Sequence, residues 1–244
     1  MKSINIFFEK KPLKMICLGF SSGLPILLVF STLSVWLVKA GISRSTVTLF
    51  SWAGFAYAFK YLWSPLVDNY KLPIFKKFGH RRSWLLFSQF LIIIALILTA
   101  FTDPKESLFF TALFITILAF FSATQDILID AFRIESAPQS LQGPLSSMYI
   151  AGYRIAMLVA GAGSLWLASF FGTEIYDQNV WKKVYLIMSL FMFVGVFATF
   201  ISDEPKLKRN LNSDNHVKFL ITILIAVIGF IYLYSVIDSP FEKK

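Results

Sequence analysis

Four ionisable side chains lie inside long apolar stretches of this sequence: Lys60, Asp126, Asp130 and Arg154. A charge near the centre of a bilayer is costly, so such residues are expected to face a bundle interior or a water-filled cavity. A carboxylate placed there beside a cation is able to take up and release a proton. The chemistry indicated is therefore the binding of protons or charged solutes inside a membrane.

The spacing of these charges indicates how they could meet. Asp126, Asp130 and Arg133 are four and three residues apart, so a continuous helix carries them on a single stripe. Asp126 and Arg154 fall in the same half of the membrane on neighbouring antiparallel runs, which predicts an ion pair between them. The alternative is a structural clamp, in which Asp130 and Arg133 lie at the headgroup level and hold helices together.

The composition places the chain in a membrane. Of its 244 residues, 57% are apolar and 15% are charged, against roughly 45–50% and 25% in an ordinary globular domain. The net charge of +9 fits loops that orient a membrane protein better than it fits nucleic-acid binding. A single cysteine, Cys17, permits no intramolecular disulfide, and with only His80 and His216 no metal site or other cofactor is expected.

The predicted fold is all-α, with seven membrane-spanning helices. Residues 1–201 are expected to form a six-helix bundle, residues 202–217 a cytoplasmic linker, and residues 218–244 a seventh helix and tail. The predicted helices cover residues 15–38, 46–67, 84–102, 107–129, 145–171, 182–201 and 218–236. Outside them, fourteen Lys and Arg residues lie on the side of the N-terminus and seven on the other, which predicts a cytoplasmic N-terminus.

Small residues mark the expected contacts between helices. Gly19 and Gly23 are four residues apart in the first predicted helix, and Gly152 begins a repeat of small residues at every fourth position in the fifth. Such stripes let helix backbones approach closely in membranes. We expect them to pack helices; the alternative is that these helices border a transport cavity.

The loop after the second predicted helix resembles the signature of the major facilitator superfamily. It reads DNY at 68–70 and GHRR at 79–82. The signature is Gly-x-x-x-Asp followed by Gly and a basic cluster; here Ser64 replaces the first glycine, and extra residues separate Asp68 from Gly79. The resemblance implies a loop that latches two bundles together at the cytoplasmic face through Asp–Arg contacts.

Longer stretches resemble the AmpG muropeptide permease family. They are GFSSGLP at 19–25, KYLWSPLVD at 60–68, FFSATQDILIDAFRIE at 120–135 and GYRIAMLV at 152–159. The likeness covers roughly the first six predicted helices, the N-terminal half of a facilitator fold. It implies an inner-membrane carrier that imports anhydro-muropeptides, driven by protons; the acetyl-CoA transporter branch shares part of the pattern.

The resemblance and the residue chemistry together define a candidate site. Lys60 and Arg154 suit the carboxylates of such a ligand, and Gln125 and Tyr153 suit its hydroxyls and amides. Asp126 is the expected proton carrier. The full set comprises the pathway residues Lys60, Gln125, Asp126, Asp130, Tyr153 and Arg154, the loop residues Asp68, Gly79, Arg81, Arg82 and Arg133, and the packing residues Gly19, Gly23 and Gly152.

Other interpretations stay open. Because the family has two bundles, we expect a truncated product: a remnant without activity, or a half that pairs with itself or with a separate second half. A membrane-embedded, Mg²⁺-dependent transferase is a further alternative, since Asp126-x-x-x-Asp130 has the spacing of half of a metal site. The expected partners are membrane lipid, protons and a small muropeptide-like molecule, without nucleic acid.

Overall fold

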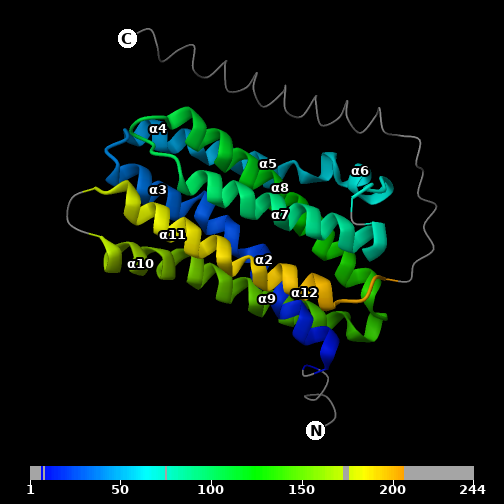
Figure 1. The fold of residues 1–244 in the computed structure, drawn as a ribbon. Helices are drawn as coiled ribbons and strands as arrows, with labels where there is room; N and C mark the ends of the chain where they lie inside the picture. The colour runs from blue at the N-terminus through cyan, green and yellow to red at the C-terminus, as the bar shows by residue number, and fades with distance from the viewer. Residues whose placement is uncertain (1–6, 8, 75, 173–175, 206–244) are drawn as a thin grey trace.

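The computed structural model of the chain is a bundle of long helices that lie side by side (Figure 1). The structure describes residues 7, 9–74, 76–172 and 176–205. The predicted seventh helix, and the predicted linker beyond residue 205, lie outside the described residues. The described part is helical without strands, so the prediction of an all-α fold is confirmed.

Among the described residues, five helices are long and apolar enough to cross a membrane. Two are continuous: α7 (His80–Ala100) and α8 (Leu108–Ser136). The others consist of successive pieces: α2 (Lys10–Val29) with α3 (Ser31–Lys39); α9 (Gln139–Leu158) with the π-helical turn η5 (Val159–Gly163) and α10 (Ser164–Phe171); and α11 (Gln178–Phe191) with α12 (Phe193–Ile201).

The prediction of one continuous helix over 46–67 was wrong. This part of the chain forms five short pieces: α4 (Arg44–Leu49), η2 (Phe50–Ala53), α5 (Gly54–Ala58), η3 (Lys60–Leu62) and α6 (Ser64–Asn69). Pro65 accounts for the last interruption, because proline has no N–H to donate and its ring clashes with the carbonyl four residues earlier. As a result, Lys60 begins a 3₁₀ turn instead of lying inside an α-helix.

Helices α2 and α9 are packed backbone against backbone. A Cβ added to Gly19 would lie 2.1 Å from the carbonyl oxygen of Tyr149, and one added to Gly152 would lie 2.0 Å from that of Ile16. Gly23 meets α9 in the same way, at 2.4 Å. A side chain at any of these positions would push the two helices apart, so glycine is required for this contact.

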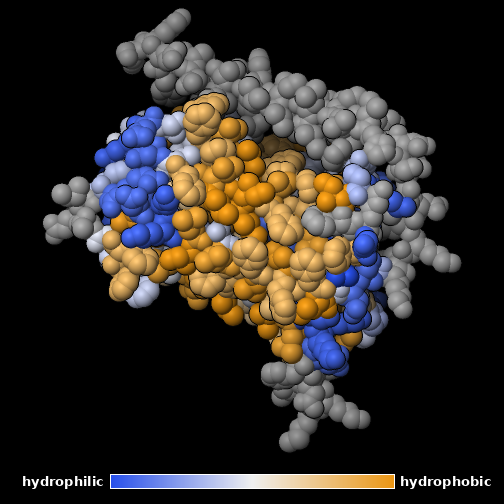
Figure 2. Space-filling view, viewed as in Figure 1, coloured by the Kyte–Doolittle hydropathy of each residue, from blue (hydrophilic) through white to orange (hydrophobic). Residues whose placement is uncertain are grey.

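The bundle has two polar ends and an apolar middle. We call the end that carries Lys10, Gly79 and Ser136 the amino end, and the end that carries Lys39 and Phe171 the far end. Figure 2 shows apolar residues across the middle of the bundle and hydrophilic residues gathered at both ends. This distribution is the one that a membrane-crossing bundle requires, because lipid contacts the middle and water the ends.

Aromatic side chains hold α3 at the far end. The ring of Trp36 stacks on that of Trp181 at 5.8 Å and 15°, and lies 5.1 Å from that of Tyr185. Trp36 Nε1 donates to the hydroxyl of Tyr176 at 3.3 Å, and this hydroxyl donates to Asp103 Oδ1 at 2.9 Å. Burial, and then the hydrogen bond to Asp103, raise the pKa of Tyr176 above its ordinary value, so it stays protonated at neutral pH.

Candidate functional site

Asp126 is the centre of a polar cluster between α2, α8, α9 and η3. Its side chain is only 11% exposed. The hydroxyl of Ser22 donates to Asp126 Oδ1, and Lys60 Nζ lies 3.6 Å from Oδ2. Tyr149 Oη lies 2.9 Å from Ser22 Oγ. Ser22 has one hydroxyl proton and gives it to Asp126, so the hydrogen bond between the two hydroxyls is donated by Tyr149.

Ser22 and Tyr149 were not among the predicted site residues. The signal for them was positional: Ser22 precedes Gly23 on the face of α2 that meets α9, and Gly19 of that face lies against the backbone of Tyr149. The glycine stripe predicts the helix contact. It does not predict that a serine in the same contact reaches a carboxylate on a third helix.

The contact between Lys60 and Asp126 is loose. Its separation of 3.6 Å exceeds the roughly 2.7–2.9 Å of a charge-assisted hydrogen bond between nitrogen and oxygen. The side chain of Lys60 is also 34% exposed, three times as much as that of Asp126. The Lys60 side chain is therefore only partly enclosed where it neutralises the carboxylate.

The predicted ion pair between Asp126 and Arg154 is not formed, and Lys60 takes the place of Arg154. Arg154 is exposed on α9, where its Nη1 lies 3.8 Å from Met157 Sδ. The reason is its direction on the helix: Gly152 faces α2, and two residues further along, at about 100° per residue, a side chain points away from that contact. Tyr153, between these two positions, is partly buried, and its ring lies 6.0 Å from that of Tyr149.

Three further predicted residues lie apart from this cluster. Arg133 Nη2 is 3.3 Å from Asp130 Oδ1, and Arg133 also donates to the hydroxyl of Ser146, which joins α8 to α9. Gln125 is completely buried, and neither of its amide atoms has a hydrogen-bond partner among the described residues. In this structure Gln125 is thus enclosed in the bundle and does not reach a surface where a ligand could bind.

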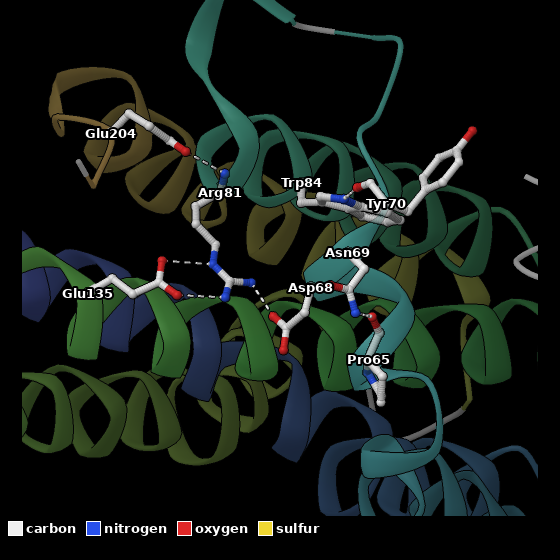
Figure 3. A network of polar contacts seen from close by, with 8 residues as sticks. All are labelled: Pro65, Asp68, Asn69, Tyr70, Arg81, Trp84, Glu135 and Glu204. Carbon is white, nitrogen blue, oxygen red and sulfur yellow. Dashed lines mark hydrogen bonds and ion pairs between the residues drawn. The ribbon is translucent and has the colours of Figure 1, made fainter. Parts of the chain in front are cut away.

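At the amino end, the signature loop forms a charge network around Arg81 (Figure 3). The Arg81 side chain is 2% exposed. Its Nη1 donates to Asp68, and its Nε and Nη2 donate to the two carboxylate oxygens of Glu135 at 3.1 and 2.8 Å. The carboxylate of Glu204 accepts the backbone N–H groups of Arg81 and Arg82 at 2.8 and 3.1 Å. The network thereby ties α6, α7, α8 and the residues after α12 together.

Gly79 makes the approach of Glu204 possible. It has φ +92°, a conformation that glycine adopts without a steric penalty, and a Cβ there would lie 2.4 Å from the carboxylate carbon of Glu204. The carboxylate lies at the start of α7, where unpaired N–H groups and the helix dipole favour a negative charge. Arg82 adds hydrogen bonds to the carbonyls of Thr199 and Phe200 at 3.0 and 2.7 Å.

The sequence identified the basic half of this network but missed part of the acidic half. Asp68, Gly79 and the two arginines of the loop were predicted; Glu135 and Glu204 were not. The available signal was that both glutamates follow the ends of apolar runs at the same end of the bundle as the loop. Arg133, which the sequence grouped with the loop, contacts Asp130 and Ser146 instead.

Long apolar helices with charges buried between them are typical of helical membrane transporters. Residues 8–241 match the family model described as the Major Facilitator Superfamily. The chain belongs to that superfamily. The family and the names of the chain's relatives are those of transporters and not of enzymes, which argues against the alternative of a Mg²⁺-dependent transferase.

The chain is similar to proteins of the AmpG type, which confirms the predicted resemblance. It is 35% identical over 259 residues to "Putative transporter AmpG 4" of Rickettsia felis, covering 97% of this chain and 61% of that protein. It is 36% identical over 203 residues to the "Anhydromuropeptide permease" of Escherichia coli, covering 83% of this chain and 39% of that protein. The chain thus spans between about two fifths and three fifths of the length of these relatives.

Proposed function

We propose that the chain provides one bundle of a proton-coupled carrier that imports anhydro-muropeptides across the bacterial inner membrane. The observation that carries the proposal is the buried carboxylate of Asp126, held by Ser22 on one oxygen and by the partly exposed side chain of Lys60 near the other. The name of the Escherichia coli relative supports the choice of cargo. Asp126 is the proton carrier in this proposal, because it is the buried carboxylate beside an exchangeable cation.

Lys60 is the proposed contact for an anionic group of the cargo. Anhydro-muropeptides carry peptide carboxylates. The Lys60 side chain, which is 34% exposed, can bind one of them without leaving Asp126 uncompensated when that acid is protonated. Arg154 is the second proposed contact, since it is exposed on α9 beside Tyr153. The enclosed Gln125 is left out of the proposed contacts.

A second bundle is proposed to cover the face of α9 and α10. Only 22% of the apolar window of Gln139–Phe171 is buried, against 50% or more in the other four candidate spans of the described chain. An exposed guanidinium in a membrane-crossing helix requires a polar or anionic partner, and a bundle of a second copy or of another chain would supply one. The amino end is proposed to face the cytoplasm, as the distribution of Lys and Arg predicts.

Uptake of radiolabelled anhydro-muropeptide tests the function, in a bacterial host that lacks its own permease. We expect accumulation that an inward proton gradient stimulates. Asp126→Asn should abolish the stimulation and Lys60→Met should lower uptake at every pH, whereas Asp130→Asn should leave uptake unchanged. Acetyl-CoA is the competing cargo to be tested in the same assay.

Three outcomes would reject parts of the proposal. Uptake by the chain only when the second half of a relative is produced with it would reject a homodimer and support the separate partner. Absence of uptake under both conditions would reject the carrier function. Proton stimulation that survives in Asp126→Asn would reject Asp126 as the proton carrier.

A further inference from the structure

Helices α2 and α9 run side by side in the same direction, and each is interrupted after 20 residues (Figure 1). Helix α2 ends at Val29, Phe30 has φ −106° and ψ −85°, and α3 continues for 9 residues. Helix α9 ends at Leu158, the π-helical turn η5 follows, and α10 continues for 8 residues. Single π-helical turns inside α-helices are frequent at functional positions and are places where helices bend.

Thr32 connects the two interruptions. Its hydroxyl donates to the carbonyl of Ala160 in η5 at 2.7 Å and lies 3.1 Å from the hydroxyl of Ser164. The backbone N–H of Ser164 donates to the carbonyls of Val159 and Gly161, whereas in a regular α-helix it would donate to the carbonyl of Ala160. The carbonyl of Ala160 thus accepts two hydroxyl groups, that of Thr32 from α3 and that of Ser164 from its own helix, in place of the backbone N–H. Thr32 is fully buried, so water does not compete for this contact.

The segments on the amino side of the two interruptions are locked together. Gly19, Gly23 and Gly152 bring the backbones of α2 and α9 into direct contact, which leaves no room for relative tilting. Ser22 and Tyr149, which serve Asp126, lie on these locked segments.

The segments on the far side are attached differently. Trp36 fixes α3 through its stacking on Trp181 and its hydrogen bond to Tyr176. The hydroxyl of Tyr185 donates to the carbonyl of Leu28 at 2.9 Å, next to the interruption of the first helix. In contrast, Trp166 on α10 is 65% exposed. The hydrogen bond from Thr32 to η5, directly before α10, connects α10 to the first helix.

We propose that η5 is a hinge about which α10 tilts at the far end, with Thr32 as the latch that couples α10 to α3 beside the interruption at Phe30. The hinge divides the second of the two helices into a locked segment, α9, which contributes Tyr149 to the Asp126 cluster, and a short segment, α10, which tilts at the far end against α3. The inference rests on this geometry and does not depend on the identity of the cargo or on proton coupling.

Distances between spin labels test the hinge in the full chain, in a Cys17→Ala background. One pair joins position 166 on α10 to position 109 on α8, both of which are exposed at the far end, and a reference pair joins position 150 on α9 to position 94 on α7. A segment of 8 residues is about 12 Å long, so a change of about 20° in its tilt moves its end by roughly 4 Å. We expect Thr32→Val to widen the far-end distance distribution by about this amount and to leave the reference pair unchanged.

Matched variants distinguish the loss of the Thr32 contact from a general loosening of the helix bundle. Thr32→Ser keeps the hydroxyl and should retain the narrow distribution. Thr111→Val removes a fully buried hydroxyl whose hydrogen bond is local, to the carbonyl of Ser107. This variant should not widen the far-end distance distribution. Ser164→Ala provides a second, milder release of the same contact if Thr32→Val does not fold. An unchanged far-end distribution in the variant that folds, or equal widening of both pairs, would overturn the hinge.

Discussion

Replacing Arg81 by methionine should destabilise the chain more than any exposed ion pair could. The substitution keeps an unbranched side chain but removes the bidentate contact of Arg81 with Glu135, whose side chain is 9% exposed. Removing one partner of a buried pair costs about 3–5 kcal/mol. Asp68 is 38% exposed, so the loss of its ion pair with Arg81 should cost as little as the loss of a surface pair, at most about 1 kcal/mol.

Thermal unfolding in detergent, followed by tryptophan fluorescence, measures this effect. At about 2–4 °C per kcal/mol for a chain of this size, the Tm of Arg81→Met should fall by roughly 6–20 °C. Arg81→Lys should recover only part of this loss, because an ammonium group cannot form the bidentate contact with Glu135. Double-mutant cycles with Glu135→Gln and Asp68→Asn then apportion the energy between the two carboxylates.

The order of the two coupling energies decides whether the reasoning holds. The Arg81–Glu135 coupling should be about 2–3 kcal/mol, and the Arg81–Asp68 coupling below about 1 kcal/mol. Equal couplings, or a larger one for Asp68, would show that burial does not set the strength of this network. A difference of about 2 °C in Tm corresponds to a stability change of about 1 kcal/mol. If the Tm of Arg81→Met lies within about 2 °C of the parent, the network is not a major source of stability.

Three further predictions concern the rest of the bundle. Gly152→Ala should lower the Tm, because its Cβ would overlap the backbone of α2. Ser22→Ala should lower proton-stimulated uptake by roughly tenfold, since a hydrogen bond to a charged group contributes about 1.5–3 kcal/mol. Tyr176→Phe should remove from an alkaline absorbance titration one tyrosine whose pKa is raised above its ordinary value. The stability that the raised pKa of Tyr176 contributes is present below about pH 10 and is lost as the pH rises further.

Each of these predictions has a control in the same part of the chain. Gly143→Ala lies on the same helix as Gly152 with open space around its Cβ, and should leave the Tm unchanged or raise it. Ser21→Ala removes a buried hydroxyl that bonds within its own helix, so an equal loss of uptake in both serine variants would contradict a specific role for Ser22. An alkaline titration curve that is identical in Tyr176→Phe and the parent would contradict the assignment of the shifted tyrosine.

The fold was predictable because apolar runs and the spacing of small residues are visible in the sequence itself. Apolar runs of bilayer length predict helices wherever no proline interrupts them, and the four-residue spacing of glycines predicts the contact between α2 and α9. The run at 46–67 is also apolar, but it is divided into short helical pieces, and Pro65 accounts for the last interruption. Composition alone does not predict such a break in a helix.

The candidate site was less predictable, because it depends on the direction in which each side chain points. Asp126 and Lys60 were both identified, yet the sequence paired Asp126 with Arg154. The rotation of α9 about its axis decides this point, and that rotation follows from the glycine contact with α2, which involves residues far away in the sequence. Glu135 was missed for the same reason, since its partner Arg81 lies on another helix.

The fragmented stretch from Arg44 to Asn69 has a consequence for how the protein enters its membrane. Its 3₁₀ turns have poorer hydrogen-bond geometry than an α-helix, and hydrocarbon offers no other partners, so we expect this stretch to be unstable alone in lipid. Its pieces pack mainly on α8, which begins at Leu108. A nascent chain must therefore keep residues 44–69 within the insertion machinery or at the bilayer surface until α8 has been synthesised, and only then can the two settle together.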